Sequence, residues 1–195
     1  WNIVNPRIST DRGGFISFEG HLSAKDCHGA IAVRSLSMQT FDISPKAAAG
    51  SISFQGTLGG SLENPVVEGN AWSESFTIGP QPFVPLKAHL EIKNNVLTAD
   101  PVVGKIPEGG DIEGFLVFHL RKGKILATRL SLVNLDLSSL RKADQPELTA
   151  LAPSGKVSGV VEKKEAGGVT WFDFNLFGGP LRIASEAIQS VNVEG

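Results

Sequence analysis

The triplet Asp26-Cys27-His28 is the one short stretch whose residue types suggest nucleophilic catalysis, since an imidazole beside a thiol can activate it. Adjacent residues on a strand point to opposite faces, so Cys27 and His28 would not meet through sequence adjacency alone. A buried or turn-flanking cysteine is the simpler interpretation of Cys27. We therefore expect that the chain is not an enzyme and has no catalytic residues.

The spacing of other residues does not favour a metal or phosphate site. His21, His89 and His119 fall on predicted strands, and no two of them have the spacing of zinc ligands. Gly-Gly pairs stand at 59–60, 109–110, 167–168 and 178–179. None is followed by a helix pattern with Lys-Ser/Thr, as a phosphate-binding loop requires, so turns explain them better. Asp136 is expected to cap the turn after it, and we expect no metal and no cofactor.

The composition limits the classes of partner. Of 195 residues, 41% are hydrophobic and 19% are charged, and the formal net charge is −2. Such a chain has no general attraction to nucleic acid or to an anionic membrane surface. Cys27 is the only cysteine, which excludes an intrachain disulfide. No apolar run reaches the roughly 18 residues of a membrane span. Because the first residue is Trp1, we expect a piece of a longer protein.

Two similar phrases predict strands. "GFISFEGHL" at 14–22 and "GSISFQGTL" at 50–58 alternate apolar and polar residues, which is typical of a sheet with one wet face. Asn94-Asn95 is expected to form a two-residue hairpin turn, since asparagine tolerates positive φ. Further strands are predicted at 30–36, 39–43, 70–79, 86–92 and 96–99, as a pair over 110–137, as a hairpin over 155–179, and as two closing strands over 180–195. Only 45–49 and 138–151 look helical.

The whole pattern predicts an all-β fold, in which an antiparallel meander forms an elongated, curled sheet with a hydrophobic groove. A closed β-sandwich is the alternative, because the apolar faces of the strands could instead cover one another. We expect a single elongated β domain over 1–195. A subdivision into 1–49, 50–143 and 152–195 is possible, with a short helical linker at 138–151.

The middle of the chain contains two sequence motifs that are typical of strands. The first is a "gG-x-I-x-G" strand with Gly110, Ile112 and Gly114. The second is an "nLDL-x-x-L" motif at the end of the returning strand, with Leu135, Asp136, Leu137 and Leu140. A flanking glycine-and-proline phrase contains Gly56, Leu58, Pro65, Val67 and Gly69. Through these motifs residues 50–140 resemble the AsmA-like proteins of bacterial envelopes, whose relatives include TamB.

The resemblance implies the periplasmic part of an inner-membrane-anchored bacterial envelope protein. Proteins of that family are built from a folded-over sheet with a hydrophobic groove. They are associated with phospholipid transport between the inner and outer membranes or with outer-membrane biogenesis. The implied partners are phospholipid acyl chains, neighbouring repeats of the same protein and outer-membrane assembly proteins, and no nucleic acid.

The candidate lipid-binding groove consists of apolar residues that alternate with polar ones on the predicted strands. These residues are Ile16, Phe18, Ile52, Phe54, Leu90, Ile92, Leu116, Phe118, Leu130, Leu132, Phe172, Phe174 and Leu176. In an open groove, acyl chains would lie along these side chains. In a filled one, the same residues would form the core of a structural or protein-interaction module that assists outer-membrane protein assembly.

Overall fold

The computed structural model describes residues 2–3, 6–9, 13–37, 48–78, 81–107, 109–138, 154–166, 169–183 and 186–194. The strands are β1 (Asn2–Ile3), β2 (Arg7–Ser9), β3 (Phe15–Leu22), β4 (Cys27–Ser37), β5 (Ala48–Gly60), β6 (Pro65–Ser73), β7 (Phe76–Ile78), β8 (Gln81–Phe83), β9 (Leu86–Lys93), β10 (Val96–Ile106), β11 (Gly110–His119), β12 (Lys124–Asp136), β13 (Lys156–Ala166), β14 (Val169–Gly178), β15 (Leu181–Ile183), β16 (Glu186–Ile188) and β17 (Val191–Glu194).

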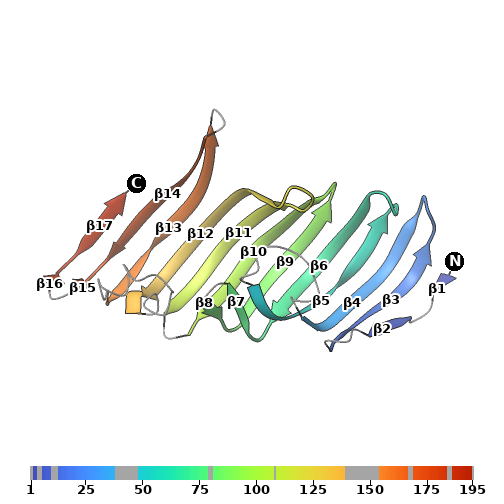
Figure 1. Ribbon diagram of the computed structural model, residues 1–195, viewed down its shortest axis with the longest axis horizontal. Helices are drawn as coiled ribbons and strands as arrows, with labels where there is room; N and C mark the ends of the chain where they lie inside the picture. Colours follow the sequence, from blue (N-terminus) through green and yellow to red (C-terminus); the bar gives the residue numbers. More distant parts are fainter. Residues whose placement is uncertain are drawn as a thin grey trace.

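Fifteen of these strands form one antiparallel sheet. Its main path is β1-β3-β4-β5-β6-β9-β10-β11-β12-β13-β14-β17, with β2 beside β3, β7 beside β5 and β8 beside β7. The strands stand side by side in nearly sequential order, as Figure 1 shows. Strands β15 and β16 form a separate two-stranded sheet. The predicted all-β meander is therefore confirmed, and the alternative of a closed sandwich is wrong because the long strands belong to one layer.

The single layer leaves much of the chain in contact with solvent. Its accessible surface is 12192 Å², whereas a compact folded monomer of 20.7 kDa exposes about 8,900 Å². The ladders β4–β5 and β12–β13 also continue the sheet across the predicted subdivision points.

Within the described part of the chain, no helix is long and apolar enough to cross a membrane.

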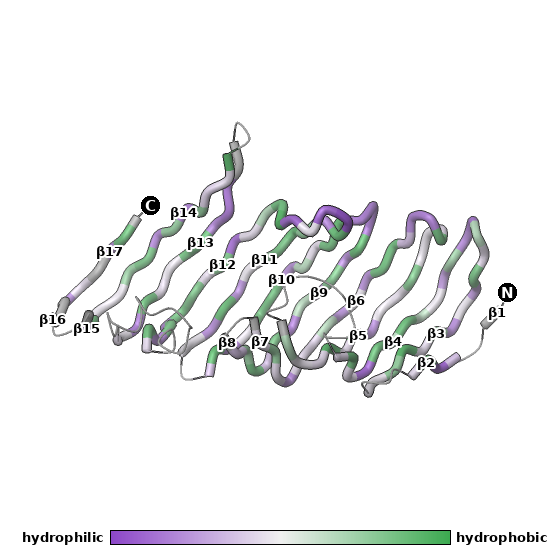
Figure 2. The backbone as a smooth tube through the Cα atoms, in the orientation of Figure 1, coloured by the Kyte–Doolittle hydropathy of each residue, from purple (hydrophilic) through white to green (hydrophobic). Residues whose placement is uncertain are grey.

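Hairpin turns follow the local sequence. Asn94 and Asn95 have φ of 53° and 62°, and they join β9 to β10 as the two-residue turn that the sequence predicts. Gly123, with φ of 58°, lies in the turn between β11 and β12. Figure 2 shows apolar and polar residues alternating along the strands, with polar residues concentrated at several turns. The hairpins therefore have the registers that the alternation requires.

Several expected elements differ from the structure. Ala48 and Ala49 begin β5, so the expected helix over 45–49 is wrong there, and 45–47 lie outside the described residues. Backbone pairing explains this, because Ala48 to Gly50 pair with β7. The expected strand over 39–43 and nearly all of the expected helical linker over 138–151 also lie outside the described residues.

The segment 70–79 is not one strand. β6 ends at Ser73, and the chain bends before β7 begins at Phe76, which turns away to pair with the start of β5 and becomes buried. The even spacing of the apolar residues in this segment did not indicate the bend. At the C-terminal end, three short strands replace the two expected. Leu181 to Ile188 form the separate β15–β16 pair, and only β17 joins the main sheet.

Candidate functional site: the apolar face of the sheet

Ladder pairing assigns residues to the two faces of the sheet, because directly paired residues of neighbouring strands share a face. One row crosses ten strands without interruption. It consists of Phe18, Ile31, Gly56, Gly69, Leu90, Ala99, Leu116, Thr128, Lys163 and Phe172. We call the face that contains this row the apolar face.

Parallel rows complete this face. A second row contains Ile16, Val33, Phe54, Ala71, Ala88, Val102, Gly114, Leu130, Val161 and Phe174. A third row contains Ile92 and Phe118. A fourth contains Leu132 and Leu176, which both pair with Gly159. Ile52 lies two residues before Phe54 on β5. The structure thus brings all 13 candidate groove residues onto one face, and Phe18 and Phe54 share it as predicted.

The apolar face is the more shielded of the two. Eight of the ten buried apolar residues belong to it, namely Cys27, Leu36, Phe54, Ala71, Ala99, Ile106, Ile112 and Val157. Ile112 is buried, while Asp111 and Glu113 on either side of it are exposed. Most other members of the face are half-buried, and Phe172 is 54% exposed. Curling of a single layer explains this intermediate burial.

Bulges contribute to the curl. The register shifts between Val33 and Leu36 in β4, and between Ala99 and Val102 in β10. The β12 ladders contain two further shifts. Extra residues on one strand bend it and increase its twist. A sheet that is bent at several strands curves around its apolar side chains without a second layer.

Polar side chains interrupt the apolar face at several positions, including Thr128, Lys163 and Ser73. The hydroxyl of Thr128 donates to the carbonyl of Phe115 at 2.8 Å, and the ammonium of Lys163 donates to the carbonyl of Ile125. Ser73 is 3% exposed, and its Oγ has no hydrogen-bond partner within the described part of the structure. The sequence did not predict the burial of Ser73, because it follows Trp72 and Ala71 in a segment that was expected to continue as a strand.

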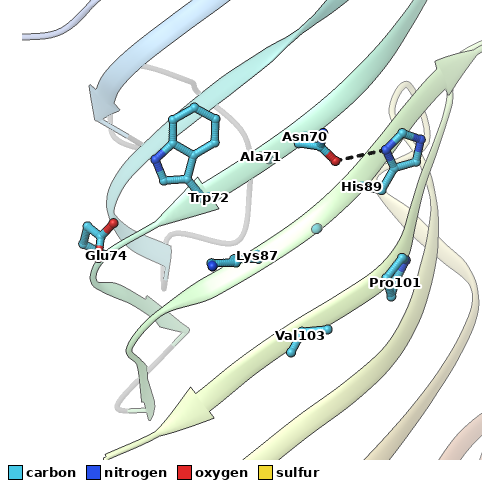
Figure 3. A pocket seen from close by; sticks show the side chains of 9 residues that line it. Asn70, Ala71, Trp72, Glu74, Lys87, His89, Pro101 and Val103 are labelled. Atoms are coloured by element: carbon cyan, nitrogen blue, oxygen red, sulfur yellow. Dashed lines mark hydrogen bonds between the residues drawn. The ribbon is translucent and has the colours of Figure 1, made fainter.

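The polar face has a shallow hollow of ≈ 490 Å³ above β6, β9 and β10. Figure 3 shows Trp72, Asn70, His89 and Lys87 around it. His89 Nδ1 lies 3.2 Å from Asn70 Oδ1, and its Nε2 lies 3.6 Å from Glu68 Oε1. These side chains are partly or fully exposed, and none of the lining residues is a serine or cysteine nucleophile.

The structure separates the thiol and the imidazole of the Asp26-Cys27-His28 triplet. Cys27 is buried, with its Sγ 3.2 Å from the Ser23 carbonyl, whereas His28 lies on the other face, 3.2 Å from Asp26 Oδ2 and stacked on His21. The adjacency argument against a Cys-His pair is therefore confirmed.

Asp136 Oδ1 accepts from the backbone N–H of Ser138 at 2.9 Å, which confirms its capping role. The described residues contain no group of three or more side chains suited to a metal ion.

No protein-family model, curated protein or solved structure matches this chain. The resemblance of residues 50–140 to AsmA-like proteins thus stays a prediction.

Proposed function

We propose that this chain is a non-enzymatic module that accommodates phospholipid acyl chains along its apolar face. The observation that carries the proposal is the row of paired residues that runs across ten strands from Phe18 to Phe172, polar only at Thr128 and Lys163, in a sheet with no second layer. At about 4.8 Å between strands, ten strands span roughly 43 Å. One leaflet of a bilayer is about 15 Å of hydrocarbon, half of the roughly 30 Å core, so the row has ample length for an acyl chain.

The energetics of such binding require no specific polar contact. Each methylene moved from water onto an apolar surface contributes about 0.8 kcal/mol when fully buried. Binding strength then depends on how continuous the apolar surface is. Head groups would remain at the open edge of the curl, where water is accessible. This agrees with a face whose members are mainly aliphatic or aromatic and half-buried.

The family resemblance supports a cellular setting for this role. In that setting the chain is the periplasmic part of an inner-membrane-anchored bacterial envelope protein. It carries phospholipid between the inner and outer membranes or supports outer-membrane biogenesis. Neighbouring repeats of the same protein would extend the sheet at its ends.

Native mass spectrometry of the purified chain tests the proposal. The wild-type protein should retain phospholipid, and Leu116→Asp or Phe118→Asp should abolish the adduct, because a carboxylate on the apolar face forces a hydrated break. Both variants should still fold, since an open face lets the charge reach water. Val117→Asp is the matched control on the polar face and should keep the lipid. Unfolding of both apolar-face variants, or a lipid-free wild type, would reject the open groove.

A strand-pairing module is the second candidate, and β14 supports it. β17 pairs only with Asn175 to Gly178 of β14, so in the described structure the outer edge of Val169 to Phe174 has no ladder partner. An unpaired edge is a template for another strand. Amide hydrogen exchange at 169–174 should slow when a peptide from an outer-membrane β-strand is added. Unchanged exchange at those amides would remove this candidate.

A further inference from the structure

The turns of five hairpins lie at one end of the sheet, because successive strands of the meander run in opposite directions (Figure 1). They are 23–26, 61–64, 94–95, 120–123 and the tip that joins Ala166 to Val169. In Figure 1 the last hairpin, β13–β14, extends beyond its neighbours. This end of the sheet therefore presents a row of tips of differing chemistry.

Exposed apolar side chains gather at the last two tips. They are Leu120, Ile125, Leu126, Val169, Trp171 and Phe172, and Val169 is 64% exposed. The two hairpins are neighbours, because β12 pairs with β13 and the Lys163 ammonium reaches the Ile125 carbonyl. A group of large, exposed apolar side chains is a common feature of interaction sites.

The first of these tips, the β11–β12 turn, is rich in cations. Residues 114–135, which include the β11–β12 turn, contain Arg121, Lys122, Lys124 and Arg129 and no carboxylate. All four are exposed. Lys163 and Lys164 of β13 stand between Glu162 and Glu165 in the sequence, and Lys164 is paired with Asp173, so the β13–β14 hairpin adds no net positive charge. The local charge is thus positive in a chain whose net charge is −2.

Aromatic and cationic side chains alternate across β13 and β14. Trp171 is paired with Lys164 on the polar face, and Phe172 is paired with Lys163 on the apolar face. The projecting hairpin therefore carries an exposed aromatic ring on each face with a lysine directly opposite. Tryptophan prefers the boundary between hydrocarbon and water, and long lysine stems extend their charge outward to head groups.

We propose that these two tips form a basic rim, residues 120–126 and 169–172 with Lys163 and Lys164, that docks on the surface of an anionic phospholipid bilayer. Trp171, Phe172 and Val169 enter the interfacial region, while Arg121, Lys122 and Lys124 attract anionic head groups. Charge complementarity and the aromatic tips favour this partner over a second copy of the chain. The docking does not depend on lipid carriage by the apolar face.

The β5–β6 tip provides a matched control. Leu62 at that tip is 62% exposed, on the same end of the sheet, but its charged neighbours are Glu63 and Glu68. An anionic surface repels this tip. Leu62→Ser thus removes an equally exposed apolar group without touching the basic rim.

Co-sedimentation of the 195-residue chain with vesicles tests the proposal. Binding is expected to phosphatidylcholine vesicles that contain phosphatidylglycerol, to be weaker with phosphatidylcholine alone, and to fall as salt is raised. Lys122→Gln with Lys124→Gln should weaken binding about twenty-fivefold, at about fivefold for each cation. Trp171→Ser with Phe172→Ser should weaken it at least tenfold, and Leu62→Ser should leave it unchanged. Circular dichroism checks that each variant keeps its strand content.

Other outcomes would overturn the docking proposal. One is binding that is equal on neutral and anionic vesicles, and another is binding that the rim variants leave unaltered. A third is absence of vesicle binding together with a dimer that Trp171→Ser dissociates, since the rim would then be an interface between copies. Lipid retention in native mass spectrometry is scored separately, so failure of docking is distinguishable from failure of lipid carriage.

Discussion

The ring of Phe54 covers Gly69 on the neighbouring strand, with Cζ 2.8 Å from the point that a Cβ on Gly69 would occupy. Gly56, which pairs with Gly69, lies under the same ring. Phe18 covers Gly29 in the same way, with Cε2 at 2.8 Å. A ring laid over glycine restores apolar contact that the missing side chain cannot make. The repeated Phe-x-Gly of the two opening phrases therefore encodes one packing device used twice.

Gly69→Ala should destabilise the protein. The new methyl would meet Phe54 and lie 2.5 Å from Gly56 Cα, with the Gln55 carbonyl closer still. We expect the free energy of unfolding to fall by about 1–3 kcal/mol, as for other overpacked sites. Gly59→Ala is the control, because its nearest neighbour would be 4.0 Å away. Chemical denaturation measures both, and equal stability of the two variants would contradict the covering role of Phe54.

The Asn94-Asn95 turn gives a test of local conformation. Both residues have positive φ, which a β-branched side chain tolerates poorly. Asn95→Val should lower the free energy of unfolding by about 1–2 kcal/mol, and Asn95→Gly should keep or raise it. Thermal melts of the two variants provide the comparison. A Val variant as stable as the Gly variant would argue against this turn geometry.

Two buried hydroxyls on the apolar face should respond in opposite ways. Ser73 Oγ is buried without a partner, so Ser73→Ala should raise the free energy of unfolding by about 1 kcal/mol. Thr128 donates to the Phe115 carbonyl, so Thr128→Val should lower it by about 1 kcal/mol. Denaturant midpoints measure both changes. Destabilisation by Ser73→Ala would mean that the hydroxyl has a binding partner in solution.

Most strands of the sheet could be predicted from the sequence, but the irregularities of the sheet could not. Period-two alternation predicted the long strands. It also placed the candidate groove residues on one face, because directly paired residues of a regular ladder share a face from strand to strand. It could not predict the corner after Ser73, since pairing with the start of β5 is non-local. Bulges such as that at Ala99 also depend on tertiary curvature. The basic rim required knowing that β12 and β13 are neighbouring strands.

The pair Lys164–Asp173 provides a test of pH dependence. The hydrogen bond that the Lys164 ammonium donates to Asp173, together with the negative charge of Asp173, raises the pKa of Lys164 above its ordinary value of 10.5. A raised pKa means that the stabilising contribution is present below pH 10.5 and is lost as pH rises through the higher folded value. Asp173→Asn should return the pKa toward 10.5, measured by NMR titration of the Lys164 side chain. An identical midpoint in both proteins would contradict the pairing.

Photocrosslinking at two adjacent positions of β9 tests the central claim most directly. Leu90 lies on the apolar face and Glu91 on the polar face of the same strand. A benzophenone amino acid in place of Leu90, activated in the producing bacterium, should give an intact protein with the added mass of a phospholipid. The same probe in place of Glu91 should give none. Lipid adducts of equal yield at both positions, or none at Leu90, would contradict a lipid-bearing apolar face.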